Sequence, residues 1–221
     1  MRIDGPRLRH IRRCSAALSC LIATTGAGAW SSKDFPLFDP VHQMAIQNVL
    51  KNLVSADDLA TLMNQQPVVD QDQNANQSFE HAMTGVENAN QKPEMQKPLY
   101  VRKTEDFVSR NLADAIAKRK AGASPAAMIA LGTALHPLQD ATSPVHEGFQ
   151  PWSFDEGWIA ATQHVSQERF YPDDSGPTGY RARLEGAVRW AYDIYVEKVP
   201  MPHQFFDASG KLQIPPAYLG P

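Results

Sequence analysis

Apolar side chains recur along this chain with the period of an α-helix. The segment 41–54 places Met44, Val49, Leu50 and Leu53 on one face, the spacing that lets an amphipathic helix bury one side. The alternation of apolar and polar residues that is typical of strands does not extend over any useful length. The pattern predicts six helices, at about 41–54, 55–65, 104–121, 124–142, 155–170 and 180–199.

Local signals support several boundaries of these helices. Ser55 opens a capping box, and Ser124-Pro125 suits the N-cap and first turn of a helix. Residues 66–103 are rich in Gln, Asn and Pro and are interpreted as a long loop, with one helical turn at most. The tail after Pro200 is expected to be irregular. Because no linker divides the chain, we predict a single compact multi-helix domain of the all-α class.

The first 29 residues differ in character from the rest. Five arginines and one acid precede a short, weakly polar run that ends in Ala27-Gly28-Ala29. A basic start, an apolar centre and a small-x-small close are typical of a secretory signal peptide. We therefore predict a signal peptide at 1–29 and a helical domain at 30–221, in a secreted or periplasmic protein. A buried N-terminal helix is the alternative.

Removal of this segment changes both the charge and the cysteine content. The whole chain has a formal charge of −3, and the loss of five arginines and one acid leaves −7. Both cysteines, Cys14 and Cys20, lie in the segment, so the mature chain would hold no disulfide. A lipoprotein with Cys20 lipidated is a further alternative. A charge of −7 does not favour the phosphate contacts that dominate nucleic-acid affinity, so no stable nucleic-acid partner is expected.

Candidate metal ligands are concentrated in the segment ALHPLQDATSPVHEGF. His136 and Asp140 are four residues apart, so they share a helix face and can hold the same ion. Ser143-Pro144 ends the helix and lets His146 turn back towards that face. Further along, His164 and Glu168 repeat the four-residue spacing on another predicted helix. Imidazole together with carboxylate is a ligand set that suits zinc.

These spacings resemble the signature of the zinc-dependent phospholipase C family, whose wider superfamily includes single-strand-specific nucleases. The signature, H-x3-D-x5-H followed by H-x3-E, is matched in both parts. Family members also use the mature N-terminal Trp as a ligand, and signal cleavage would place Trp30 there. The chain is also similar to exported or toxin-linked bacterial proteins that carry HAM and LHxxQDxTSPxHxGFQPW segments. The resemblance implies a compact helical fold with up to three zinc ions at one cleft.

The resemblance further implies how ligands are shared among the ions. The early histidine that the family pattern expects is His42, and an Asp followed by a His is supplied by Asp70 and His81, with Asp72 as the competitor of Asp70. His203 matches no ligand and is interpreted as structural or exposed. The implied ligand sets are Asp70, His81, His136 and Asp140 for one ion, His146, His164, Glu168 and water for a second, and Trp30, His42 and Asp140 for the third.

The function that the resemblance implies is hydrolysis of a phosphodiester, most closely the cleavage of phospholipid head groups by a metal-activated water. Asp70 is the candidate catalytic base. The implied partners are a phospholipid or other phosphodiester substrate and, peripherally, a membrane surface; the oligomeric state is not readable. Two departures from the family pattern are Lys33, where choline-specific members carry Glu, and Pro137 after the first motif histidine.

Two other functions stay open at this point. A single-strand nuclease or nucleotidase would use the same ions, although such enzymes typically begin Trp-Gly with a histidine soon after. A non-catalytic, zinc-stabilised toxin-accessory module is the alternative of a different class, and a site fully ligated by protein would favour it.

Overall fold

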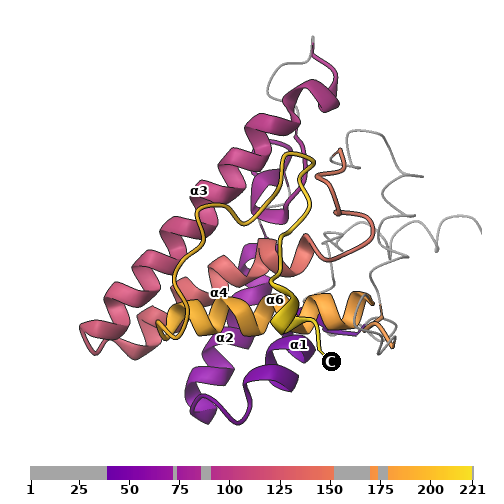
Figure 1. The fold of residues 1–221 in the computed structure, drawn as a ribbon. Helices are drawn as coiled ribbons and strands as arrows, with labels where there is room; N and C mark the ends of the chain where they lie inside the picture. Colours follow the sequence, from indigo (N-terminus) through magenta and orange to yellow (C-terminus); the bar gives the residue numbers. More distant parts are fainter. Residues whose placement is uncertain (1–38, 72–73, 86–90, 152–169, 174–178, 221) are drawn as a thin grey trace, which may run out of the picture.

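The computed structural model describes residues 39–71, 74–85, 91–151, 170–173 and 179–220 (Figure 1). These residues form an all-α structure, as predicted, with two isolated β-bridges as their only strand-like pairing. None of the described helices is both long and apolar enough to cross a membrane. The elements are α1 (Val41–Leu50), α2 (Ala56–Val69), the 3₁₀ turn η1 (Ser78–His81), α3 (Pro93–Lys120), α4 (Ser124–Asp140), α6 (Tyr180–Tyr195) and the 3₁₀ turn η2 (Pro216–Tyr218).

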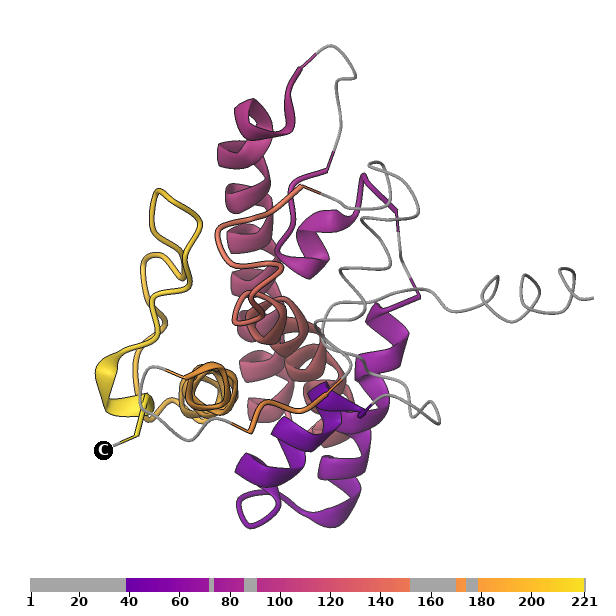
Figure 2. The same cartoon turned by 90° about the vertical axis from the view of Figure 1, so that its right-hand side faces the viewer.

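Helix α4 lies at the centre, packed against α2, α3 and α6 (Figures 1 and 2). Twelve of its 17 residues are buried, because small and apolar residues occupy most positions around it. Gly132 allows α2 to approach closely, since a Cβ at this position would lie 2.9 Å from the Cβ of Gln65. The central helix can therefore deliver side chains into the interior at its C-terminal end.

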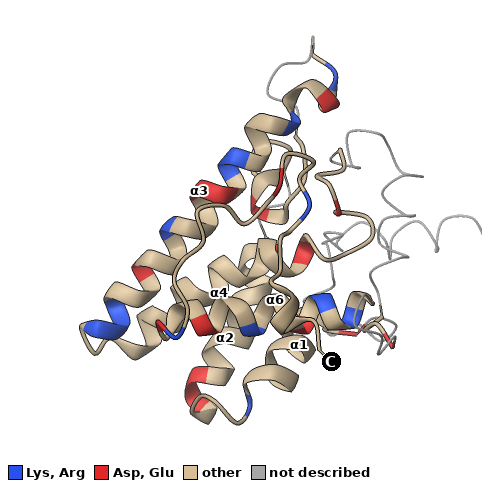
Figure 3. Ribbon diagram, in the orientation of Figure 1, with Lys and Arg blue, Asp and Glu red and all other residues tan. Residues whose placement is uncertain are grey.

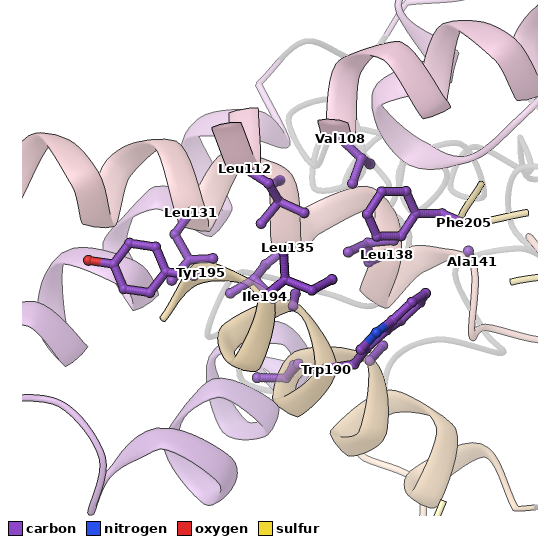
Figure 4. Packing of buried hydrophobic residues seen from close by; sticks show 14 of the residues in the cluster. Val108, Leu112, Leu131, Leu135, Leu138, Ala141, Trp190, Ile194, Tyr195 and Phe205 are labelled. Carbon is purple, nitrogen blue, oxygen red and sulfur yellow. The ribbon is translucent and has the colours of Figure 1, made fainter. Parts of the chain in front are cut away.

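The core joins side chains from all five described α-helices and from the C-terminal tail. Figure 4 labels the part that lies between α3, α4, α6 and the tail. Leu135 and Leu138 of α4 meet Leu112 of α3 and Ile194 of α6 in a continuous apolar cluster. Phe205 from the tail is fully buried in the same cluster, with its ring 5.2 Å from that of Trp190. The tail after Pro200 is irregular, as predicted, apart from η2, but it is part of the core.

The prediction of a long loop at 66–103 is wrong over much of its length. Helix α2 continues to Val69 although it contains Pro67, and α3 begins at Pro93, eleven residues before the predicted start at Thr104. Pro93 occupies the first helical position, where its missing N–H costs nothing. The remaining helix ends differ from the predictions by a few residues, while the predicted signal peptide and the predicted helix at 155–170 lie outside the described residues.

The segment 74–85, part of the predicted loop, is held against α3 by specific contacts. Thr104 Oγ1 donates to the carbonyl of Phe79 at 2.7 Å, and the Tyr100 hydroxyl donates to the carbonyl of Ala75 at 3.3 Å. Gly85 packs so closely that a Cβ would lie 1.8 Å from the Ala75 carbonyl oxygen. These contacts fix η1 and therefore the position of its last residue, His81.

Candidate metal centre

Three segments bring two histidines and two aspartates into one buried cluster. His136 and Asp140 lie in the last turn of α4, His81 ends η1, and Asp70 is the C-cap of α2. Lys, Arg, Asp and Glu recur along α3 (Figure 3), whereas the sequence of α4 contains one residue of these four types, Asp140. These four side chains are between 0 and 6% exposed. Burial of so many ionisable groups is costly unless they are paired or hold a metal.

The ligand atoms of this cluster face one another at short range. His136 Nε2 lies 3.3 Å from Asp70 Oδ1, 3.3 Å from Asp140 Oδ2 and 3.1 Å from His81 Nδ1. His81 Nδ1 lies 3.2 Å from Asp140 Oδ2 and 4.0 Å from Asp70 Oδ1. The two imidazole nitrogens therefore lie close to each other and to both carboxylates, and the four side chains come from three elements of the fold.

These separations fit the coordination of a tetrahedral ion. Ligand atoms at about 2.0–2.1 Å from zinc are about 3.3–3.4 Å from each other in a regular tetrahedron. For Asp70, His81 and His136, which form one metal-capable group, the observed separations of 3.1, 3.3 and 4.0 Å bracket that value. Two imidazoles and two carboxylates are also a donor set that zinc accepts. The cluster could hold a metal ion, and this coarser part of the cofactor prediction is confirmed.

His42 of α1 forms a second metal-capable group with His136 and Asp140. Its Nε2 lies 3.1 Å from Asp140 Oδ1, and its ring stacks on that of His136 with the centroids 4.4 Å apart. Although His42 Nε2 and Asp140 Oδ1 are this close, the contact is not a hydrogen bond, and within the described part of the chain both atoms and His42 Nδ1 are buried without a hydrogen-bond partner. Asp140 thus presents Oδ1 to His42 and Oδ2 to His81 and His136, the arrangement expected of a carboxylate that could be shared between two ions.

The electrostatics of the cluster favour a positive charge at its centre. Burial lowers the pKa of His136, but the carboxylates of Asp140 and Asp70 outweigh this and raise it to about 10. Burial likewise raises the pKa of Asp140, while His136 and His42 hold it well below its ordinary value. The surrounding groups therefore stabilise a cation there, whether it is a proton on imidazole or a metal ion.

His146 also turns towards the cluster, although it is not in either metal-capable group. Its Nδ1 donates a hydrogen bond to the backbone carbonyl of His81, which leaves the lone pair of the neutral ring on Nε2. The chain around it adopts left-handed backbone at Gly148 and Phe149. Thr84 holds this turn through its N–H to Gln150 O and its hydroxyl to Phe149 O, at 3.0 and 2.9 Å.

The remaining predicted ligands cannot be placed. Trp30, His164, Glu168 and the competitor Asp72 lie outside the described residues, and nothing follows for their roles. His203 is exposed, as expected, and neither metal-capable group includes it.

Two buried glutamines that the sequence patterns did not single out support the cluster. Gln139 donates from Nε2 to the backbone carbonyl of His42 at 3.1 Å, and Gln66 contacts the His136 ring at 3.2 Å. One sequence signal for Gln66 exists, since it precedes Asp70 by four residues and shares its face of α2. Gln139 gives no comparable signal, because its role depends on the packing of α1 against α4.

Comparisons with protein-family models, with curated proteins and with solved structures find no match for this chain. The resemblance to zinc-dependent phospholipases C therefore rests on the sequence motifs alone.

Proposed function

We propose that this protein is a zinc-dependent phosphodiester hydrolase that cleaves phospholipid head groups in the manner of a phospholipase C. The observation that carries the proposal is a buried cluster in which nitrogens of His81 and His136 lie 3.1 Å apart and within 3.2–4.0 Å of carboxylate oxygens of both Asp70 and Asp140. The residues at these positions are those that the family resemblance assigns to the first ion.

The proposed roles of the side chains follow from their chemistry. Asp70, His81, His136 and Asp140 would hold one ion, and Asp140 would extend its other oxygen to a second ion beside His42. Bound zinc would supply Lewis-acid stabilisation of phosphate oxygens and acidify a bound water. Asp70, at 6% exposed the least enclosed of the four, would orient the attacking water and accept its proton.

The wider proposal includes residues outside the described part of the chain. The ligand set of a further ion would combine His146 with His164 and Glu168, and the amino group of Trp30 would join His42 after signal cleavage. Export and a peripheral contact with membranes belong to the same proposal. Up to three zinc ions per chain would then be bound.

The test uses protein beginning at Trp30, loaded with zinc and assayed for its metal content. Release of water-soluble phosphomonoester from mixed phosphatidylcholine, phosphatidylethanolamine and phosphatidylglycerol vesicles is expected, and a chelator should abolish it. Asp140→Asn should lose the activity, while Asp114→Asn, the same chemical change at an exposed site, should retain it. Single-stranded oligonucleotide is tested in parallel.

Three outcomes would contradict the phospholipase proposal in different ways. Cleavage of oligonucleotide without release from vesicles would assign the nuclease function to the same ions. Stoichiometric zinc without either activity would favour the non-catalytic module, which four protein ligands around one ion would suit. If the protein takes up no zinc, the phospholipase, the nuclease and the zinc-stabilised module are all contradicted.

A further inference from the structure

The side chain of Gln66 crosses from α2 to α4 in the interior and is fully buried. Its Nε2 donates to the carbonyl of Leu62 in its own helix at 3.2 Å and to the carbonyl of Gly132 in α4 at 3.1 Å. A backbone carbonyl can only accept hydrogen bonds. The amide nitrogen of Gln66 must therefore face these two oxygens, and the orientation of the amide is fixed.

This orientation determines which nitrogen of His136 carries a proton. The amide oxygen of Gln66 faces His136 Nδ1 at 3.2 Å, and because an amide oxygen only accepts, Nδ1 must be the donor. The lone pair of the neutral ring is then on Nε2. That atom is the one that lies 3.1–3.3 Å from His81 Nδ1, Asp70 Oδ1 and Asp140 Oδ2.

The close approach of α2 and α4 makes this contact possible. Gly132, which supplies one of the two carbonyls, stands four residues before His136 and leaves no room for a Cβ against Gln65. A larger residue at 132 would separate the helices and move the amide of Gln66 away from the imidazole. The contact between Gln66 and His136 therefore depends on the glycine at position 132.

We propose that Gln66 is the positioning residue of the candidate metal centre: it fixes the tautomer and ring plane of His136, so that Nε2 is presented to an ion that prefers imidazole and carboxylate, such as zinc. This inference rests on the proposed metal centre. Polar partners that orient a ligating imidazole commonly contribute 10–100-fold to metal affinity.

A matched control is available in the neighbouring residue. Gln65 also joins α2 to α4, through Nε2 to the hydroxyl of Thr133 at 3.1 Å, but it does not touch His136. Gln65→Met and Gln66→Met both remove a hydrogen bond between these helices while keeping the length of the side chain. A purely structural role of Gln66 predicts a lower melting temperature and unchanged zinc affinity, as for Gln65→Met.

Zinc affinity is measured by competition with a chromophoric chelator, well below the melting temperature of each variant. Gln66→Met is expected to weaken binding by about 10–100-fold, and Gln65→Met to change it by less than about twofold. Gln66→Glu retains an acceptor for Nδ1–H and should recover part of the affinity. Equal affinities of wild type and Gln66→Met would overturn the inference.

Long-range ¹H–¹⁵N correlation spectra of the zinc-loaded wild type test the tautomer directly, without relying on any variant. A proton on His136 Nδ1 is expected, and a proton on Nε2 instead would overturn the inference. If the wild type binds no zinc, both the inference and the proposed metal centre are wrong. If it binds zinc with an affinity that Gln66→Met does not change, only the inference is wrong.

Discussion

Two carboxylates on neighbouring helices, Glu105 and Asp140, are shielded from water but have different kinds of neighbours. Glu105 of α3 is half-buried and accepts hydrogen bonds from the backbone N–H groups of Phe205 and Phe206, with its Oε1 at 2.7 and 2.6 Å. Burial raises its pKa, the hydrogen bonds from Phe205 and Phe206 oppose this, and the neighbouring Asp106 adds to the rise. The result is a clamp that holds the C-terminal tail on α3.

Asp140 of α4 is fully buried and faces three imidazoles rather than amides. One of its oxygens has no hydrogen-bond partner among the residues that the structure describes. Its pKa is held low by His136 and His42, in spite of the burial that raises it.

The difference lies in what each set of neighbours can donate. A backbone N–H always carries its proton and completes the needs of Glu105 within the protein. A neutral imidazole carries one proton on two nitrogens, and His136 directs its Nδ1 proton at Gln66. Its Nε2 lone pair therefore faces the Asp140 carboxylate unless a cation lies between them. Burial of a carboxylate therefore does not by itself indicate a site, whereas burial against several imidazoles does.

The largest difference between the two carboxylates is expected when each is replaced by its isosteric amide. Asp140→Asn is expected to weaken zinc binding by more than about 100-fold, since it removes the negative charge that lies within 3.1–3.3 Å of His42, His81 and His136. Glu105→Gln is expected to leave zinc affinity within about twofold, because it retains Oε1 as an acceptor. Isothermal titration with zinc compares them, and similar losses in both variants would contradict the distinction.

Although Glu105 is not expected to affect zinc binding, its loss should lower folding stability more than the loss of an exposed carboxylate on the same helix. Glu105→Ala leaves two backbone N–H groups without their acceptor and is expected to cost about 2 kcal/mol of unfolding free energy. The control is Asp114→Ala on the same helix, where an exposed ion pair with Lys118 is lost at a cost of about 0.5 kcal/mol or less. Urea denaturation of metal-free protein gives both values, and equal losses would show that Glu105 is not a clamp.

Part of this arrangement could be predicted from the sequence because it depends on local spacing. The pair His136 and Asp140 meets through the geometry of one helix turn, and their spacing was sufficient to predict a shared face. The all-α class followed from apolar periodicity, and the centre of each described helix was located correctly except in α3. There the exposed Met95 and Pro98 give no apolar stripe, and the helix is continued by packing at Gln96 and Tyr100.

The rest could not be predicted from local spacing, because it depends on contacts between distant segments, and only the family resemblance assigned His42, Asp70 and His81 to the ions. His81 reaches the cluster through hydrogen bonds of Tyr100 and Thr104 to the backbone of 74–85. The clamp at Glu105 joins residues about one hundred positions apart, and nothing near Glu105 in sequence indicates it. Gln66 is recognisable only once α2 and α4 are seen to meet at Gly132.

The smallest expected effect is the pH dependence of the contribution that Glu105 makes to the unfolding free energy. The unfolded chain releases the proton of Glu105 near its ordinary pKa of 4.5, whereas the folded chain retains it to a higher pH, because burial has raised the pKa. The contribution of Glu105 to stability is thus full below pH 4.5 and is lost as pH rises through the folded-state pKa. The amide that Glu105→Gln introduces does not titrate, so the unfolding free energy of wild type relative to this variant should decline across that window and then level off. Urea denaturation at constant ionic strength, with chelator present, measures this difference. If this difference instead rose with pH, the hydrogen bonds from the backbone N–H groups of Phe205 and Phe206 would outweigh burial and lower the pKa of Glu105. Glu105 would then resemble Asp140, whose pKa is also held low.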